Sequence, residues 1–351
     1  MDTIITLLLF IFILGLIVLV HEFGHFFFSK LFHVHVYEFS IGMGPKIWGS
    51  KPDKGGTTYN IRAIPIGGFV SLAGEDALED DKDVPVNERL YSKPTWQRFL
   101  IMVFGAGNNF ILAFVTLLII GIFNGSTVMT PVITKLEKDY PMYLSGIREN
   151  DKILEINGDK VSTIDDLQIY VVLASKNEES TFLIERDGKE LEYKVTPKEE
   201  KDEKGNVSYK FGIVYEPVYE HGILNAFKFA FTKIFSLFKQ MIITLKSLFT
   251  GTLGVKNLSG PVGIYSIVGT AKESGFFNLL SLLALLSVNV GFINLLPFPA
   301  FDGGRVLFLI IEKIKGSPVS PSVENTIHNI GFILLMILII YITFNDILHL
   351  I

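Results

Sequence analysis

The chain has 351 residues and a formal net charge of −5, and 49% of its residues are hydrophobic, among them 30 phenylalanines. Its mean hydropathy is +0.43. This is more apolar than a soluble core of that length requires, so the composition predicts a membrane protein. The charges form no basic block, which excludes a nucleic-acid-binding protein. The chain contains no cysteine, which excludes disulfides, thiolate metal sites and cysteine nucleophiles.

Four uncharged apolar runs are near or above the roughly 20 residues that a helix needs to cross a bilayer. They are residues 3–20, 99–134, 274–301 and 329–345. Asp2 precedes the first run and no basic residue appears before Lys30, so we expect a retained helix and not a cleaved signal. Lysines and arginines in the loops after the first and third runs predict that both loops are cytoplasmic. Both termini are then expected outside.

Between the first two runs, residues 34–93 are rich in glycine and β-forming residues. Two short strands joined by residues 51–56 fit this stretch. The acidic run at residues 75–83 is expected to be a solvated loop. Residues 131–215 change in composition: charges are frequent and apolar residues alternate between turns such as Asn157-Gly158. This stretch predicts a separate soluble domain.

The segment 223–249 is apolar but carries four lysines. Offsets of eleven and seven residues bring Lys228, Lys239 and Lys246 to nearly the same helical angle, beside a face of Phe, Leu and Ile. This pattern predicts an amphipathic helix that lies on the bilayer surface. A fifth membrane span is the alternative.

The first apolar run ends in His21-Glu22-Phe23-Gly24-His25. In a helix His21 and His25 stand one turn apart on the same face, so both imidazoles can reach one metal ion. Glu22 is offset from them, which suits a carboxylate that acts on a metal-activated water and is not a ligand. Such a pattern also arises by chance, and histidines often only pack. Three adjacent ionisable groups in a membrane span are costly, however, and a shared metal ion explains them.

Zinc favours three protein ligands in catalytic sites, so two histidines leave one ligand missing. Asp302 ends the third apolar run at the same expected depth as His21, and a carboxylate oxygen is an acceptable zinc ligand. The alternative role of Asp302 is a turn residue before Gly303. Pro297 and Pro299 cannot continue a regular helix, so the backbone is expected to open there beside a protein cavity. Asn294 can hydrogen-bond an extended peptide, or alternatively a neighbouring helix.

At these residues the chain resembles the site-2 protease family of intramembrane metalloproteases, in particular the bacterial RseP/RasP type. The HEFGH sequence stands for the family's HExxH, and Asn294 to Gly303 stands for its NxxPxPxxDG. The resemblance implies zinc as cofactor, with His21, His25 and Asp302 as ligands and Glu22 as general base. It also implies substrate contacts for Asn294, Pro297 and Pro299.

Further segments extend the resemblance along nearly the whole chain. Residues 145–171 resemble a PDZ domain, with Asn150 where that family usually has glycine. The two expected strands resemble the family's membrane-associated β-hairpin, which could hold an unwound substrate by strand addition; an ordinary soluble hairpin is the alternative. Gly42 and Gly44 would permit close backbone approach. The second span has Gly105-Ala106 where the family often has Gly-Pro, and 259–269 resembles a segment before the third span.

We therefore expect a multipass α-helical membrane protein with four transmembrane helices, a β-hairpin and one inserted extracytoplasmic α+β PDZ domain. The expected order is the HExxH span at 1–30, hairpin and loop at 31–97, second span at 98–124, PDZ domain at 125–216, interfacial helix at 217–256, third span at 257–304, cytoplasmic loop at 305–325 and fourth span at 326–351.

The resemblance implies a zinc endopeptidase of the bacterial plasma membrane that performs regulated intramembrane proteolysis of single-pass membrane proteins near the cytoplasmic side. Anti-sigma factors and remnant signal peptides are the substrates it implies, and the lipid bilayer and a PDZ-bound peptide or ectodomain are further expected partners. The competing hypothesis is a non-catalytic membrane metal-binding protein or PDZ scaffold. Glu22 favours the enzyme, because a site that only binds metal has no use for a further carboxylate beside its ligands.

Overall fold

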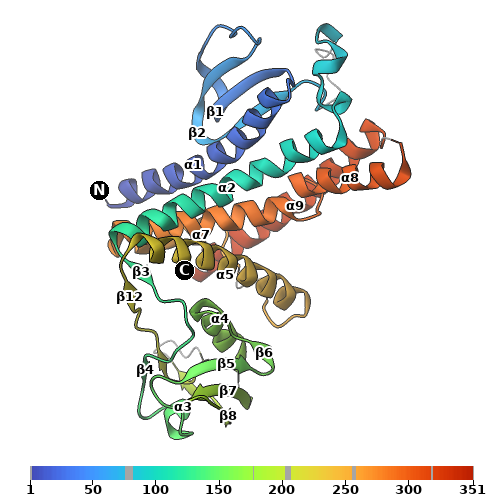
Figure 1. The fold of residues 1–351 in the computed structure, drawn as a ribbon. Coiled ribbons are helices and arrows are strands. Elements are labelled where there is room, and N and C mark those ends of the chain that lie inside the picture. Colours follow the sequence, from blue (N-terminus) through green and yellow to red (C-terminus); the bar gives the residue numbers. More distant parts are fainter. Residues whose placement is uncertain are drawn as a thin grey trace. The chain divides into compact units, whose positions relative to one another are not determined.

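The computed structural model describes residues 2–75, 82–176, 178–201, 207–254, 258–317 and 319–350. The chain divides into two compact units (Figure 1). Unit 1 comprises Met1–Thr116 and Val255–Ile351, and unit 2 comprises Leu117–Gly254. Most of the acidic run at 75–83, which we expected to be a solvated loop, lies outside the described residues.

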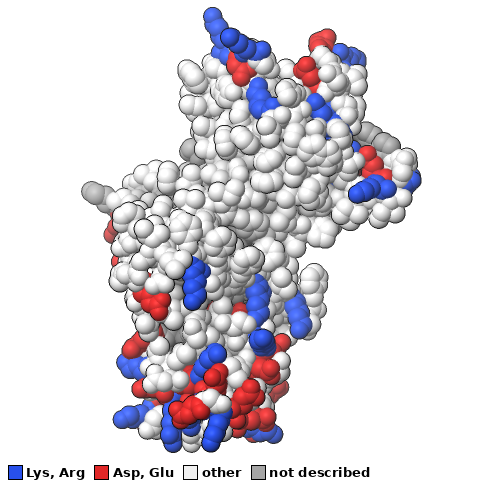
Figure 2. All heavy atoms as spheres, viewed as in Figure 1, with Lys and Arg blue, Asp and Glu red and all other residues white. Residues whose placement is uncertain are grey.

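Four helices in the described ranges are long and apolar enough to cross a membrane, which confirms the predicted number. They are α1 (Asp2–Leu31), α2 (Thr95–Phe123), α7 (Phe276–Leu295) and α9 (Pro321–Leu350). Many of their large apolar side chains are exposed, as expected for contact with acyl chains. Figure 2 shows that Lys, Arg, Asp and Glu are concentrated over unit 2 and are sparse on the span helices.

The segment expected to be one span at 257–304 contains two helices separated at Gly275. The first, α6 (Pro261–Glu273), is too short to cross a bilayer and packs on α1 through Val268. Asp346 of α9 accepts hydrogen bonds from the backbone N–H groups of Gly260 and Gly263, at 3.3 and 2.8 Å, at the start of α6. The second helix, α7, is the span. A short loop then leads to α8 (Asp302–Lys315).

Strands β1 (Val36–Gly49) and β2 (Thr58–Leu72) pair antiparallel, but they are longer than the two short strands expected. Phe39 of β1 has partners on both sides, Tyr59 and Val70 of β2, so each strand bends and the sheet contains four strand segments. The bend in β1 contains Gly42 and Gly44, with φ of +84° and +81°. Residues with a Cβ rarely adopt that conformation.

In unit 2 a four-stranded antiparallel sheet has the order β6-β5-β7-β8. Its core includes Ile153, Phe182 and Ile184 of the sheet and Leu167 of helix α4 (Ile164–Ala174). Thr163 and Asp166 form a capping box that starts α4. The sheet strands are β5 (Lys152–Ile156), β6 (Asp159–Lys160), β7 (Ser180–Arg186) and β8 (Lys189–Val195). The remaining elements are α3 (Pro141–Leu144) and the strand pairs β3 (Ser126–Thr127) with β12 (Tyr219–Glu220), β4 (Lys135–Leu136) with β11 (Ile213–Val214), and β9 (Lys198–Lys201) with β10 (Val207–Lys210).

Helix α5 (Ile223–Phe249) packs on α4 within unit 2. Lys233 forms an ion pair with Asp165 at 2.6 Å, and Lys239 forms one with Asp166 at 2.7 Å. The three lysines of the expected stripe therefore differ in their surroundings. Lys239 is paired with Asp166 of α4, whereas Lys228 and Lys246 are exposed. The position of the buried Asp165 and Asp166 determines which lysines form ion pairs. Helical periodicity alone does not reveal that position.

Candidate metal centre

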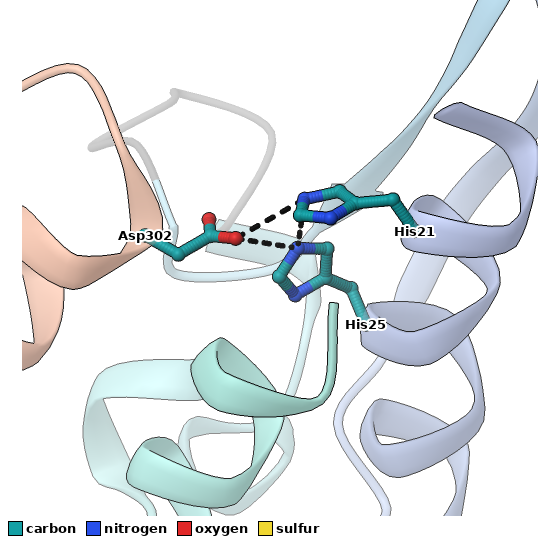
Figure 3. Close-up of side chains that lie close together, drawn as sticks. All are labelled: His21, His25 and Asp302. Atoms are coloured by element: carbon teal, nitrogen blue, oxygen red, sulfur yellow. Dashed lines mark hydrogen bonds and ion pairs between the residues drawn. The ribbon is translucent and has the colours of Figure 1, made fainter. Parts of the chain in front are cut away.

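Helix α1 carries His21 and His25 one turn apart, and Asp302 is the first residue of α8 (Figure 3). One Asp302 oxygen, Oδ2, lies 3.1 Å from Nε2 of His21 and 3.3 Å from Nε2 of His25. The two Nε2 atoms are 3.2 Å apart. The structure thus brings together the three side chains that the sequence selected, from positions about 280 residues apart.

The donor set fits a cation. Nδ1 of His25 lies 2.8 Å from the carbonyl oxygen of Ile101, so it carries the proton and donates it. In a neutral ring Nε2 of His25 is then a bare lone pair, and it faces the Asp302 carboxylate oxygen and the other imidazole. Three electron-rich atoms at such distances repel one another unless a positive ion lies between them. A tetrahedral zinc ion with ligand bonds of about 2.0–2.1 Å would place its ligand atoms about 3.3 Å apart, and the observed separations are 3.1–3.3 Å.

Helix α2 forms the wall behind the histidines with residues four positions apart. Ile101 supplies the carbonyl for His25. At Gly105 a Cβ atom would lie 2.2 Å from Nε2 of His25, so only glycine leaves room for the ring. Asn109 is fully buried, and its Nδ2 lies 3.5 Å from Nδ1 of His21. Groups that hold the second nitrogen of a metal-binding histidine fix its tautomer and orientation.

The orientation of the Asn109 amide depends on the tautomer of His21. Its Oδ1 is buried without a hydrogen-bond partner in the described part of the chain, while its Nδ2 faces a ring nitrogen. If His21 presents Nε2 to a metal ion, its Nδ1 carries the proton and needs an acceptor. The oxygen and nitrogen of an amide are assigned from such networks. Rotating the amide by 180° would place Oδ1 where Nδ2 now lies and so give Nδ1 of His21 an acceptor.

Glu22 is half-buried on α1 beside the ligands. It interacts electrostatically with His21, His25 and Asp302, and with Glu75 beyond the end of β2. The group of side chains able to share one metal ion contains His21, His25 and Asp302 but not Glu22. Glu22 thus lies near these three side chains without belonging to their group, and its role as the carboxylate that acts on water stays a prediction.

The loop between α7 and α8 holds the other predicted residues. Asn294 is half-buried at the end of α7, and Pro297 is exposed in the loop. Pro299 packs against Gly331 of α9, where an added Cβ would lie 2.5 Å from the Pro299 carbonyl oxygen. The contact that the structure gives Pro299 is thus with α9, and its contact with substrate stays a prediction.

The close approach at Gly42 occurs within the sheet, since a Cβ there would lie 2.5 Å from the carbonyl oxygen of Ile64. At Gly44 the neighbour is the flexible side chain of Ile64, at 3.2 Å. Both glycines are required by the bend of β1. Whether the sheet also accepts substrate is a separate proposal.

Two features of the site escaped the sequence reasoning. One is the face of α2 described above, for which the available signal was Gly105 and Asn109 four residues apart on a span helix. The other is Gly24, inside the HEFGH sequence, where a Cβ would lie 2.0 Å from the carbonyl oxygen of Phe104. Gly24 lets α2 approach α1 at the level of the ligands.

The chain is similar in sequence to known proteins over nearly its whole length. The sequence matches peptidase family M50 over residues 9–338. It is 32% identical to the regulator of sigma-W protease RasP of Bacillus subtilis, with 97% of this chain and 98% of the relative covered. It is 31% identical to the zinc metalloprotease RasP of Geobacillus kaustophilus, with 99% and 98% covered.

Proposed function

The chain belongs to peptidase family M50 and is a zinc metalloprotease of the site-2 protease type, and from this premise we propose that it hydrolyses a peptide bond within or beside the membrane span of a single-pass protein. The observation that carries the proposal is the group of His21, His25 and Asp302. Their ligand atoms lie within 4.8 Å of one another in a unit built from helices able to span a membrane. A metal site in that position suits a substrate that enters from the bilayer.

His21, His25 and Asp302 would hold the zinc ion. When bound, zinc supplies Lewis-acid chemistry that polarises the scissile carbonyl and makes water acidic enough to lose a proton near neutral pH. Glu22 accepts that proton as the water attacks and passes it to the leaving amine. Ile101 and Asn109 keep the two imidazoles in the tautomer that presents Nε2 to the ion. Gly105 keeps the space that the His25 ring needs.

A helical substrate hides its carbonyl groups in its own hydrogen bonds, so it must be unwound before cleavage. We assign this step to the bent sheet of β1 and β2, whose strand edges can pair with an extended peptide. The side chains of Ile41, Met43, Ile47 and Trp48 are exposed along β1, which suits insertion into lipid. Asn294 and the exposed Pro297 are the loop residues that we assign to substrate contact, together with Pro299 where it is not covered by α9.

The substrates we propose are anti-sigma factors and remnant signal peptides, cut near the cytoplasmic side of a bacterial plasma membrane. The name of the Bacillus relative, a regulator of sigma-W, supports the first class. The proposed topology places the N-terminus, unit 2 and the C-terminus outside. Because the chain lacks cysteine, single cysteines at the exposed positions Lys54 and Lys189 can test it: an impermeant thiol reagent should label only Lys189→Cys in intact cells.

We propose that residues 125–216 are a PDZ domain that excludes bulky, uncut ectodomains. The left-handed backbone of Asn150 (φ +73°), where the PDZ family usually has glycine, supports this assignment. Helix α5 would lie on the membrane surface beneath the domain. Leu224, Phe231 and Phe235 are exposed on one face of α5, while Lys233 binds the domain from the opposite face. Deleting residues 131–215 should admit uncut substrates, and unchanged selectivity would contradict the gating role.

The decisive experiment compares cleavage of a co-expressed single-pass reporter without its ectodomain by the wild type and by Glu22→Gln, with bound zinc measured in both. The exposed Glu273 on α6 provides the control substitution Glu273→Gln. We expect Glu22→Gln alone to abolish cleavage while it retains zinc. If no protein cuts any of a panel of reporters although all hold zinc, the non-catalytic metal-binding hypothesis replaces the protease.

A further inference from the structure

The loop that delivers Asp302 contains a strained turn. The N–H of Phe301 donates a hydrogen bond to the carbonyl oxygen of Phe298 at 3.2 Å, which closes a four-residue turn with Pro299 and Ala300 at its centre. Ala300 has φ of +84°. Proline followed by a residue with positive φ is the pattern of a type II turn, where glycine or asparagine normally occupies the second position. With alanine, the turn is less favourable and needs support from its surroundings.

Helix α9 supplies that support through His328. The backbone N–H of Ala300 donates a hydrogen bond to Nδ1 of His328 at 3.1 Å. The imidazole is half-buried and packs against Phe308 of α8, with ring centroids 5.8 Å apart. The bond thus fastens the strained residue itself, only two positions before Asp302.

The next turn of α9 contacts the same loop. Gly331 is three residues after His328 and therefore on the same helix face. A Cβ at Gly331 would lie 2.4 Å from Cβ of Pro299 and 2.5 Å from its carbonyl oxygen. Gly303 and Gly304 of α8 are also close to this loop, because an added Cβ would lie 2.2 Å from the carbonyl oxygen of Leu296 and 2.5 Å from that of Phe298, respectively. The turn therefore contacts both α8 and α9, and the hydrogen bond from the Ala300 N–H to His328 adds a directed interaction to this packing.

We propose that His328 is a positioning residue: by accepting the Ala300 N–H it holds the turn in its left-handed form and keeps Asp302 within reach of His21 and His25. This inference rests on the proposed function, because it takes Asp302 as a zinc ligand. A metal site tolerates ligand displacements of only about 0.2 Å, so relaxation of the turn should loosen the metal. This role requires a hydrogen-bond acceptor where Nδ1 of His328 lies. The amide oxygen of an asparagine at position 328 can provide that acceptor.

The test uses the full-length protein in detergent and a matched pair of variants. His328→Leu removes the acceptor, and His328→Asn, which is of similar size, keeps one. Asn329→Leu adds a leucine at the neighbouring exposed position as a control for the helix. The readouts are the rate of zinc release to a chelator and the visible absorption spectrum of the Co²⁺-substituted protein, which reports ligand geometry.

We expect His328→Leu to release zinc at least about tenfold faster, in the range found for residues that orient metal ligands, and to change the Co²⁺ spectrum. His328→Asn and Asn329→Leu should resemble the wild type. Wild-type behaviour of His328→Leu, or equal losses in His328→Leu and His328→Asn, would overturn the inference. If His328→Leu fails to fold, Gly331→Ala replaces it, because the added Cβ displaces the same turn while His328 is intact. Normal zinc release by Gly331→Ala would then show that the turn does not control the metal site and would overturn the inference.

Asp302→Ala separates this inference from the function on which it rests. Loss of zinc from Asp302→Ala together with normal zinc release from His328→Leu contradicts only the role of His328. Retention of zinc by Asp302→Ala contradicts the proposed metal site, and the role of His328 fails with it.

Discussion

Replacing Gly105 with alanine adds one methyl group where the structure has no room for it. The added Cβ would lie 2.2 Å from Nε2, 2.5 Å from Cε1 and 2.9 Å from Cδ2 of His25. An unstrained contact requires about 3.5 Å, so the imidazole or α2 would have to move by about 1 Å. That displacement is several times the tolerance of about 0.2 Å for a metal ligand. We expect zinc affinity to fall about 10–100-fold and cleavage by a similar or larger factor.

The same helix provides a control for this prediction. At Gly107 the atom nearest to an added Cβ belongs to the ring of Phe104 and lies 3.3 Å away, so the methyl group needs a displacement of only a few tenths of an ångström. Gly107→Ala makes the same chemical change two residues away and should retain zinc. Both variants are purified in detergent, loaded with zinc and challenged with a chelator, and thermal unfolding is recorded in parallel. If Gly105→Ala releases zinc no faster than Gly107→Ala, the close packing of α2 on His25 does not constrain the metal site and the reasoning is wrong.

Three further predictions address other contacts. Asn109→Leu should speed zinc release about 10–100-fold, whereas Asn109→Asp, which keeps an acceptor for the imidazole, should retain most of the affinity; similar release by both would contradict the hydrogen-bond role. Lys233→Met leaves the buried Asp165 without its cation and should destabilise unit 2 by about 2–3 kcal/mol, measured by amide hydrogen exchange of α4. Lys228→Met, at an exposed position, should change the exchange of α4 little. Burial raises the pKa of Glu38 in β1, but hydrogen bonds outweigh this effect and hold the pKa below its ordinary value. The stabilisation of the sheet by Glu38 should therefore persist near pH 4.5 and be lost as the pH falls through the lower folded pKa, and exchange of β1 that accelerates already between pH 6 and 5 would refute this. The hydrogen bonds that lower the pKa of Glu38 are donated by the side chains of Ser40, Asn60 and Arg62.

Local geometry explains which parts of the site were predictable from the sequence. Residues four apart on a helix share a face whatever the rest of the chain does, so His21 and His25 could be paired at once. The number of spans followed from the length and polarity of apolar runs in the same way. Asp302 required one more step. The first and third spans are expected to run in the same direction, which predicts that Asp302 and His21 lie at the same depth, and the structure places Asp302 beside the histidines.

Contacts between distant segments explain what was missed. The periodicity of α5 gives the angles of its lysines correctly, but it does not say that Asp165 and Asp166 of α4 lie in reach of Lys233 and Lys239. The content of β-forming residues predicted two strands in the hairpin region, yet composition does not show that Phe39 of β1 pairs with β2 on both of its sides. In each case the deciding partner comes from another element, and the sequence alone does not specify the pairing.

The close crossing of α1 and α2 links packing to the chemistry of the metal site. Gly24 admits the carbonyl group of Phe104 to within 2.0 Å of where a Cβ would be, and the adjacent Gly105 admits the ring of His25. At this separation the Ile101 carbonyl lies 2.8 Å from Nδ1 of His25. A larger residue at either glycine would separate the helices and remove the acceptor that fixes the tautomer of His25, a proposed zinc ligand. We therefore propose that the glycine inside the HEFGH sequence belongs to the metal site, because it sets the distance between the helix that carries the histidines and the helix that carries Ile101 and Gly105.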